Sequence, residues 1–362
     1  MSILKVNAIR HSSATVDAIT TKTDGTCEAN VTSINGGQIS NKNKVDNGSM
    51  LVSQRYGTSS HTPSNSSRNY VLDRFFYWSN VSSKASVQQV TDAPVGFSHS
   101  AKCTVVSAHT ASSGEWFGFG TTIEAQDMYD LEQGTSNAKT FTLSFYVKSS
   151  VTGTWAGASR TKAGSPSRSY PFSYTINSAN TWERKTITIE GCPDGTWLTG
   201  INEGMCLWFD LGTGSSFHQT VNQWFSGNAT GATASPFINN SGATWFITGI
   251  QLESGSIATE YEHCSYAKEL DKSMRYYQAS SDDLNAALNS NVSPSGYSNV
   301  NIFFKAQMRT TPTVNYTWTG NDGSGPSQQS TSSIGTNSFV PLCYASGNQA
   351  YRINTWNADA EF

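Results

Sequence analysis

The alternation of hydrophobic and polar positions in the middle of the chain predicts a series of β-strands. In residues 141–148, Phe141, Leu143, Phe145 and Val147 alternate with polar or bulky positions, which is the period of a strand that buries one face. Residues 71–78 are apolar on both faces, so they are expected in the centre of a sheet. The same reasoning predicts strands at 102–108, 116–122, 182–189, 205–211 and 244–253.

The hydrophobic period changes after residue 253. Residues 254–259 are rich in turn formers, and from residue 260 apolar positions recur at three- and four-residue steps. These positions include Tyr261, Cys264, Leu270 and Met274, and this spacing predicts a helix over 260–278. Within the strand-rich region, only residues 125–131 are expected to form a helical turn.

These patterns divide the chain into four parts. Residues 1–46 are polar with two short apolar runs, so they are predicted to be an attachment or oligomerisation segment; the alternative is a disordered leader. Residues 47–262 contain strands separated by turn signals without helices between them, which predicts two packed antiparallel sheets, a jelly roll or a close relative. Residues 263–278 are predicted to form a linker helix, and residues 279–362 a small C-terminal β domain with a long loop or hairpin tip at 320–336.

Composition supports an all-β protein and excludes several functions. Charged residues make up 14% of the 362 residues, against roughly 25% in ordinary domains. The net charge of −3 does not suit a protein that tracks nucleic-acid phosphates. No apolar run is long enough to span a membrane, and no signal peptide is apparent, so synthesis in a cytoplasm is expected. The six scattered Cys are expected to be reduced, buried thiols.

The sequence shows no pattern that predicts catalysis, a metal site or a cofactor. The six His are dispersed, and the motifs of hydrolases, zinc proteases and phosphate-binding loops are absent. Glu124, Asp127 and Asp130 cluster near Glu132, which a solvated acidic loop explains. They are the first carboxylates to test if the chain cleaves a glycan, because a glycosidase needs two facing carboxylates. Asp322 lies in a loop that turn chemistry explains without calcium.

The aromatic surplus gives a candidate binding function. Aromatic residues make up 12% of the chain and include ten Trp. Trp155, Tyr170, Trp197 and Trp224 lie in turn-rich stretches, so we predict that they lie on loops and bind a glycan, since flat rings cover the apolar faces of sugars. The alternative is that these rings plug the ends of the sandwich or fill a subunit interface. Trp182, Trp208 and Trp245 lie in strand patterns and are assigned to a core or an interface.

Several short segments resemble a pattern found in bacteriophage fibre-type proteins that have a jelly-roll body of the carbohydrate-binding-module type. These segments are GIQLE (249–253), ATEYE (258–262), YAKEL (266–270), RYY (275–277), NGSM (47–50), QR (54–55), DRF (73–75) and ADAEF (358–362). The opening, SILKVNAI (2–9), is similar to the start of short virion appendage proteins of marine phages.

This resemblance implies a structural virion protein, and the lack of paired acids and His favours one without enzymatic activity. The first hypothesis is a homotrimeric short tail fibre that binds a host surface glycan or docks on the tail. Residues 1–46 are then expected to attach it to other virion proteins. The alternatives are a head fibre or a capsid decoration protein and, from a different class, a glycan-cleaving tail spike. In each case the protein is expected on the virion, on the tail or the capsid surface.

Overall fold

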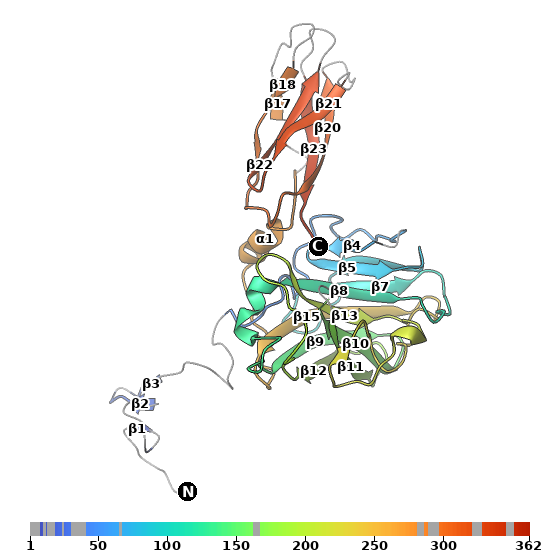
Figure 1. The fold of residues 1–362 in the computed structure, drawn as a ribbon, viewed down its shortest axis with the longest axis vertical. Helices are drawn as coiled ribbons and strands as arrows, with labels where there is room; N and C mark the ends of the chain where they lie inside the picture. Colours follow the sequence, from blue (N-terminus) through green and yellow to red (C-terminus); the bar gives the residue numbers. More distant parts are fainter. Residues whose placement is uncertain are drawn as a thin grey trace.

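The computed structural model describes residues 8–9, 12, 19–23, 25–29, 41–64, 67–161, 167–280, 286–288, 297–320, 328–344 and 351–362. Figure 1 shows a rounded body, an elongated C-terminal arm that projects from it and a small N-terminal sheet. Strands dominate the described residues, and the one α-helix among them, α1 (Tyr266–Met274), lies where the arm meets the body. The all-β prediction is therefore confirmed.

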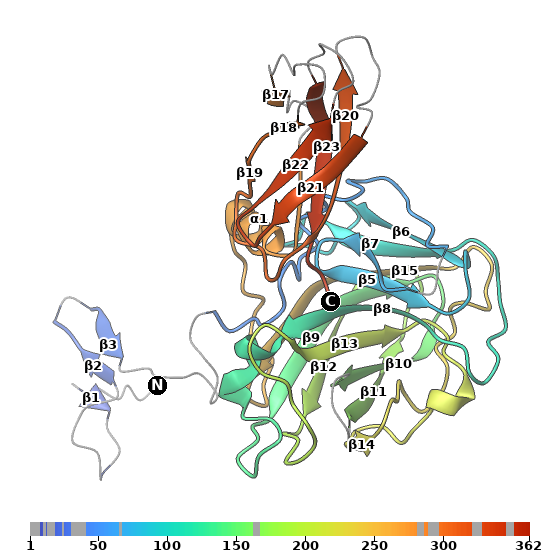
Figure 2. The same ribbon diagram turned by 45° about the horizontal axis from the view of Figure 1, so that its top comes forward.

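The body is a jelly-roll β-sandwich of two antiparallel sheets (Figures 1 and 2). In spatial order, the seven-stranded sheet contains β14 (Phe225–Ser226), β11 (Arg168–Ile176), β10 (Gly153–Arg160), β13 (Glu203–Asp210), β8 (Phe117–Glu124), β5 (Phe75–Ser79) and β4 (Asn69–Leu72). The five-stranded sheet contains β12 (Glu183–Ile189), β9 (Phe141–Ser149), β15 (Thr244–Ser254), β7 (Ser100–Val105) and β6 (Ala85–Val90). Two 3₁₀ turns, η1 (Ala125–Leu131) and η2 (Ser215–Phe217), follow β8 and β13, and η1 is the predicted helical turn.

The main hydrophobic core lies between the two sheets. On β9 the predicted inward residues Phe141, Leu143, Phe145 and Val147 are all fully buried. Opposite them, the seven-stranded sheet contributes Phe119 and Phe209 among others, and Phe145 packs edge-on against Phe209 at 5.0 Å between ring centroids. Such dense aromatic packing fixes the two sheets to each other.

The expected central strand at 71–78 is instead a hairpin near the sheet edge. β4 and β5 pair with each other, and β4 is the last strand of the sheet. The turn between them is made by Asp73 and Arg74, and Arg74 adopts a positive φ of 69°. Side chains at both faces of β5 are buried because the outer face is covered by aromatic rings, so two-sided hydrophobicity does not indicate a central strand here.

The predicted helix over 260–278 is shorter than expected. It begins after Ser265, whose side-chain oxygen accepts a hydrogen bond from the Lys268 amide, and residues after Met274 enter strand β16 (Tyr277–Ala279). Residues 260–264 cannot join the helix because their polar groups are used elsewhere. The Glu262 amide donates to Gln251 Oε1, and the Glu262 carboxylate accepts from the backbone amide of Asn41.

The C-terminal arm is a second, smaller β-sandwich. One sheet contains β16, β23 (Tyr351–Asp359), β17 (Ala286–Leu288) and β20 (Thr313–Gly320), and the other contains β18 (Tyr297–Asn299), β22 (Ser338–Tyr344), β19 (Ile302–Phe303) and β21 (Gln328–Ile334). Its own core includes Trp318, Phe339 and Trp356. Within the expected long loop or hairpin tip at 320–336, residues 328–334 instead form strand β21, which pairs with β22.

Residues 41–46, assigned from the sequence to the N-terminal segment, lie against the body. The Lys44 amide donates to the Leu252 carbonyl, and the Asn43 side chain contacts the backbone of Ile250 and Leu252 on β15. Farther towards the N-terminus, β1 (Ala8–Ile9), β2 (Ile19–Thr21) and β3 (Cys27–Ala29) form a three-stranded sheet away from the body (Figures 1 and 2).

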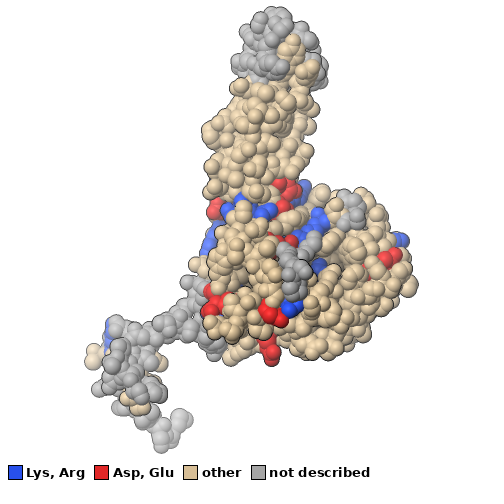
Figure 3. All heavy atoms as spheres, viewed as in Figure 1, with Lys and Arg blue, Asp and Glu red and all other residues tan. Residues whose placement is uncertain are grey.

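Charged side chains gather where the arm meets the body, whereas the arm itself shows few of them on this face (Figure 3). At this junction, the C-terminal residues enter the body. Glu361 pairs with Arg74, and Asp359 pairs with Arg55 at 2.6 Å. The Arg74 guanidinium also stacks 3.3 Å from the centroid of the Tyr276 ring. Ion pairs and stacking thus hold the arm against the sandwich.

Candidate functional site

The seven-stranded sheet carries aromatic residues on its outer face as well as in the core. On β5, Phe75 and Tyr77 enter the main core, so Phe76 and Trp78 point outward. On β13, Leu207 and Phe209 enter the core, and Cys206 and Trp208 form a separate outer cluster with Phe76. Tyr70, Trp78 and Trp116 pack against this cluster and remain partly exposed.

Glycine on the neighbouring strand makes room for these rings. Gly118 on β8 lies directly opposite Trp78 of β5. A Cβ atom at Gly118 would lie 2.1 Å from the indole of Trp208, and one at Gly120 would lie 2.5 Å from the Leu207 carbonyl oxygen. The buried Trp208 ring therefore packs against the backbone at Gly118, and it lines a hollow on this face of the sheet.

This hollow, which we call the outer aromatic pocket, has a volume of about 100 Å³. Its lining residues come from both sheet strands and loops: Trp78, Trp116, Arg160, Trp208, Phe217, Asn228 and Thr230. Trp78 packs edge-on against both Trp116 and Trp208, with ring centroids 5.7 and 6.1 Å apart. Phe217 packs edge-on against Trp116 at 6.0 Å. The walls are therefore rigid rings that support one another.

Polar atoms of the pocket lining lack hydrogen-bond partners. Among the described residues, Trp116 Nε1, Trp208 Nε1, Arg160 Nε and Thr230 Oγ1 are buried and make no hydrogen bond. A buried polar group without a partner costs roughly 1–3 kcal/mol. Apolar walls with a few unused donors are typical of a small-molecule site, because a ligand can supply the missing acceptors.

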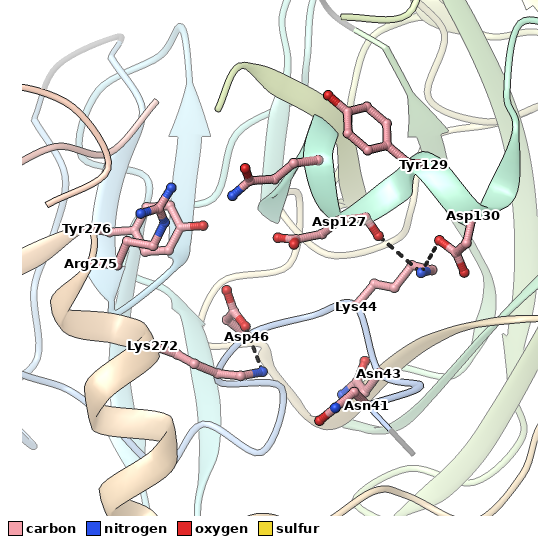
Figure 4. Close-up of a pocket in the computed structure, with 11 residues that line it drawn as sticks. Asn41, Asn43, Lys44, Asp46, Asp127, Tyr129, Asp130, Lys272, Arg275 and Tyr276 are labelled. Atoms are coloured by element: carbon pink, nitrogen blue, oxygen red, sulfur yellow. Dashed lines mark hydrogen bonds and ion pairs between the residues drawn. The ribbon is translucent and has the colours of Figure 1, made fainter. Parts of the chain in front are cut away.

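A second, larger hollow of about 540 Å³ lies between residues 41–46, η1 and α1 (Figure 4). Its basic groups are all paired: Lys44 with Asp130 at 2.6 Å, Lys272 with Asp46 at 3.0 Å, and Arg275 with Glu124 through two hydrogen bonds of 2.9 and 3.0 Å. These pairs tie three segments together. The polar groups of this cleft therefore serve the fold, unlike those of the outer aromatic pocket.

The carboxylates singled out from the sequence lie in or beside this cleft. Glu124 is engaged by Arg275 and Gln126, and its side chain is fully buried. Asp130 is paired with Lys44. Asp127 faces the cleft (Figure 4), and burial, followed by the nearby Asp46 and Glu124 charges, raises its pKa. The prediction of a purely solvated loop is therefore wrong for Glu124.

The structure separates the four predicted glycan contacts into two groups. Trp155 and Tyr170 do not lie on loops: they belong to β10 and β11 and are 0% and 3% exposed. Trp155 packs in the core against Trp245, whose assignment to a core is confirmed. A ring without exposed surface offers no stacking face to a ligand, so the location predicted for these two residues was wrong.

Trp197 and Trp224 remain partly exposed at one end of the sandwich. Their rings pack edge-on at 5.9 Å, and Trp224 also packs against Tyr170 at 5.3 Å. The indole nitrogens donate to the carbonyls of Asp194 and Glu190, respectively. This arrangement resembles the alternative in which aromatic rings plug the end of the sandwich, and glycan contact by these two residues stays a prediction.

Sequence reasoning missed the outer aromatic pocket although its signal was present. The strands predicted at 71–78 and 205–211 carry apolar residues on both of their faces. The strand predicted at 116–122 contains Gly118 and Gly120. In a sandwich, one face of each strand already meets the core. The second apolar face, together with glycines on a neighbouring strand, indicates an aromatic cluster on the outside.

Other site classes receive no support in the described part of the chain. No group of three or more His, Cys, Asp and Glu side chains comes together there as a ligand set. Five of the six Cys are described as free thiols, and four of these are buried. The helix that the structure describes is too short and too polar to cross a membrane.

No protein-family model matches the sequence, and no curated protein matches it either. Among solved structures, the chain is similar to the enzymatically active domain of tailspike protein 4 from bacteriophage CBA120, with 16% identity and a TM-score of 0.34 over 59% of this chain. That match spans 21% of the tailspike chain.

Carbohydrate-binding modules are also among the similar structures. A family 11 module from Clostridium thermocellum, in complex with a β-1,3-1,4-mixed-linked tetrasaccharide, matches with 10% identity, a TM-score of 0.28, 51% of this chain and 91% of that chain. The module TmCBM61, in complex with β-1,4-galactotriose, matches with 10% identity, a TM-score of 0.28, 59% of this chain and 99% of that chain. Because these sequence identities and TM-scores are low, the function of this chain has to be argued from its own residues.

Proposed function

We propose that the sandwich binds a carbohydrate in the outer aromatic pocket. The observation that carries this proposal is the combination of supported aromatic walls with buried donors that have no partner. The C–H faces of a sugar ring can stack on the partly exposed indoles of Trp78 and Trp116, and a sugar hydroxyl can accept a hydrogen bond from Trp116 Nε1. Ligand binding would thus remove the cost of the unsatisfied groups.

We further propose that this binding serves a bacteriophage virion, with the chain as a homotrimeric short tail fibre. Support comes from the sequence resemblance to phage fibre-type proteins and from the elongated arm (Figure 1). Three copies on one fibre would raise the effective strength of a weak single site. The alternative is a head fibre or a capsid decoration protein. Immunogold labelling of virions distinguishes a location on the tail from one on the head.

The carbohydrate proposal is tested with the Trp116→Ala variant on an array of bacterial surface polysaccharides. Wild-type protein is expected to bind at least one of them, and Trp116→Ala to bind it ~10-fold more weakly, because a stacked aromatic contributes on the order of 1–3 kcal/mol. The matched control is Trp182→Ala, which removes a partly exposed indole next to the opposite, five-stranded sheet.

Two outcomes contradict the proposal. One is a folded Trp116→Ala protein that binds as wild type does, and the other is loss of binding in Trp182→Ala alone. Release of reducing sugar from the bound polysaccharide would show cleavage in place of plain binding. In that case Asp127→Asn is the first variant to examine, because Asp127 faces the cleft of Figure 4 without a hydrogen bond to its carboxylate among the described residues.

A further inference from the structure

Arg160 stands apart from the other buried arginines of the body. Its side chain lies at the end of β10, and the residue is 5% exposed. Arg68 pairs with Glu203, and Arg74 pairs with Glu361. Arg160 has no carboxylate within ion-pair distance in the described part of the chain. It is therefore a buried positive charge without a negative partner.

The contacts of Arg160 leave part of its guanidinium unused. Nη1 donates to Asn228 Oδ1 at 2.7 Å, and the guanidinium lies 4.5 Å from the centroid of the Trp208 ring. Nε is buried without a partner, and no hydrogen bond of Nη2 occurs among the described residues. Stacking on an indole offsets part of the burial cost of the cation. It does not supply an acceptor for the free N–H groups.

The chemistry of the missing partner follows from the shape of the free edge. An arginine keeps its charge under all ordinary conditions, and burying that charge is unfavourable without a counter-charge. Its planar fork of N–H donors fits the two oxygens of a carboxylate. The lining of the outer aromatic pocket includes no acidic residue that could compete for Arg160.

We propose that the outer aromatic pocket is selective for an acidic sugar, a residue whose carboxylate binds the free edge of Arg160 while its ring stacks on the surrounding indoles. This inference rests on the proposed carbohydrate binding and names the class of sugar. Uronic acids and sialic acids share the required chemistry, since both carry a carboxylate on a pyranose ring.

The test compares acidic oligosaccharides with their carboxyl-reduced counterparts, in which each carboxylate becomes a primary alcohol and the ring is unchanged. The probes are oligogalacturonate, alginate oligosaccharides, a glucuronate-containing oligosaccharide and sialyl-lactose. The full-length protein is expected to bind at least one acidic probe ~10-fold more tightly than its reduced form by isothermal titration calorimetry. Dextran sulfate serves as the control for unspecific attraction to negative charge.

Variants connect the preference to Arg160. Arg160→Gln is expected to bind the acidic and reduced probes equally, at the strength with which wild type binds the reduced one. The matched control, Arg184→Gln, removes one positive charge from the opposite sheet, where Arg184 donates to the Thr259 carbonyl, and it is expected to keep the preference. Trp116→Ala is expected to weaken both probes of a pair.

Each result decides between the inference and the function on which it rests. Equal binding of acidic and reduced probes by wild type overturns the acidic-sugar inference and leaves carbohydrate binding intact. The same conclusion follows if folded Arg160→Gln keeps the preference, or if dextran sulfate binds as well as the best probe. Trp116→Ala binding like wild type overturns the proposed function, which places carbohydrate binding in the outer aromatic pocket. The wild-type comparison stands even if Arg160→Gln does not fold.

Discussion

At the scale of single residues, the outer face of the seven-stranded sheet depends on where side chains are missing. Trp208 can pack closely against β8 because Gly118 has no side chain there. The same indole supports Arg160 from one side and Trp78 from another. One misplaced methyl group at this point would therefore disturb both the stacking surface and the cation of the pocket.

The first prediction concerns this methyl group. Gly118→Ala places a Cβ 2.1 Å from the Trp208 ring, so the indole has to move. We expect a loss of about 1–3 kcal/mol in the free energy of unfolding, as for other overpacked sites, measured by urea denaturation. The control is Gly114→Ala, where no atom lies within 4 Å of the added Cβ. Equal stability of the two variants would contradict the assigned position of Trp208.

Single residues also show why sequence reasoning predicted some of the site and missed the rest. Turn-rich neighbours suggested loops for Trp155 and Tyr170, but β10 and β11 pair over eight positions and carry both rings into the core. Local composition cannot report such long-range pairing. Arg160 gave no signal at all, because whether a carboxylate lies near it depends on which strands become neighbours.

At the scale of elements, regular alternation predicted the position of a strand and its core-facing residues well, even where both faces of the strand are buried. Strand β9 lies at 141–149 with the predicted inward residues. The predicted bounds of elements were wrong where hydrogen bonds from side chains end a strand or delay the start of a helix. The hairpin at Asp73 and Arg74, and the late start of α1 after Ser265, are both set by hydrogen bonds to residues far away in the sequence.

At the edge of the five-stranded sheet, a side chain of strand β12 also fixes a turn through hydrogen bonds. The Glu183 carboxylate accepts hydrogen bonds from the Asn177 and Ser178 amides at 2.8 and 2.9 Å and from Lys185 Nζ at 2.5 Å. Burial alone would raise the pKa of Glu183, but the hydrogen bonds from Lys185, Ser178 and Asn177 outweigh it and lower the pKa to about 2. The charged carboxylate thus closes the turn between β11 and β12.

The second prediction follows from the sign of this shift. Because the folded pKa lies below that of the unfolded chain, Glu183 stabilises the fold above the unfolded pKa and loses this effect as the pH falls towards about 2. Glu183→Gln is expected to cost about 1 kcal/mol at pH 7. The difference from wild type should shrink steadily below pH 5 in urea denaturation. Glu190→Gln, at an exposed position beyond β12, is the control for the loss of one carboxylate. A deficit in Glu183→Gln that stays constant with pH would contradict the assignment.

At the scale of the whole molecule, the arm and the body are joined through buried charges. The side chains of Arg74 and Glu361 are 1% and 3% exposed, and Arg74 also donates to the Thr122 carbonyl on β8. Phe362 lies over the guanidinium of Arg309 at 4.0 Å. The last residues of the chain therefore connect β23 of the arm to the same sheet that carries the outer aromatic pocket. If the protein acts as a fibre, this joint fixes the direction in which the pocket faces relative to the arm.

The third prediction tests this joint. Glu361→Gln keeps the shape of the side chain but removes the nearer counter-charge of Arg74, whose other carboxylate partner, Asp46, lies 4.0 Å from Nε. Removal of one partner from a buried ion pair typically costs about 3–5 kcal/mol. We expect a loss of about 3 kcal/mol in urea denaturation, together with faster hydrogen exchange of the β16 amides, which lie beside the joint. The control is Glu132→Gln, which breaks the exposed pair with Lys139, whose side chains are 40% and 48% exposed, and should cost less than about 1 kcal/mol. If both variants lose the same small amount, the arm is held by its apolar contacts. If Glu361→Gln loses stability without faster exchange at β16, the ion pair stabilises the sandwich but does not fix the arm.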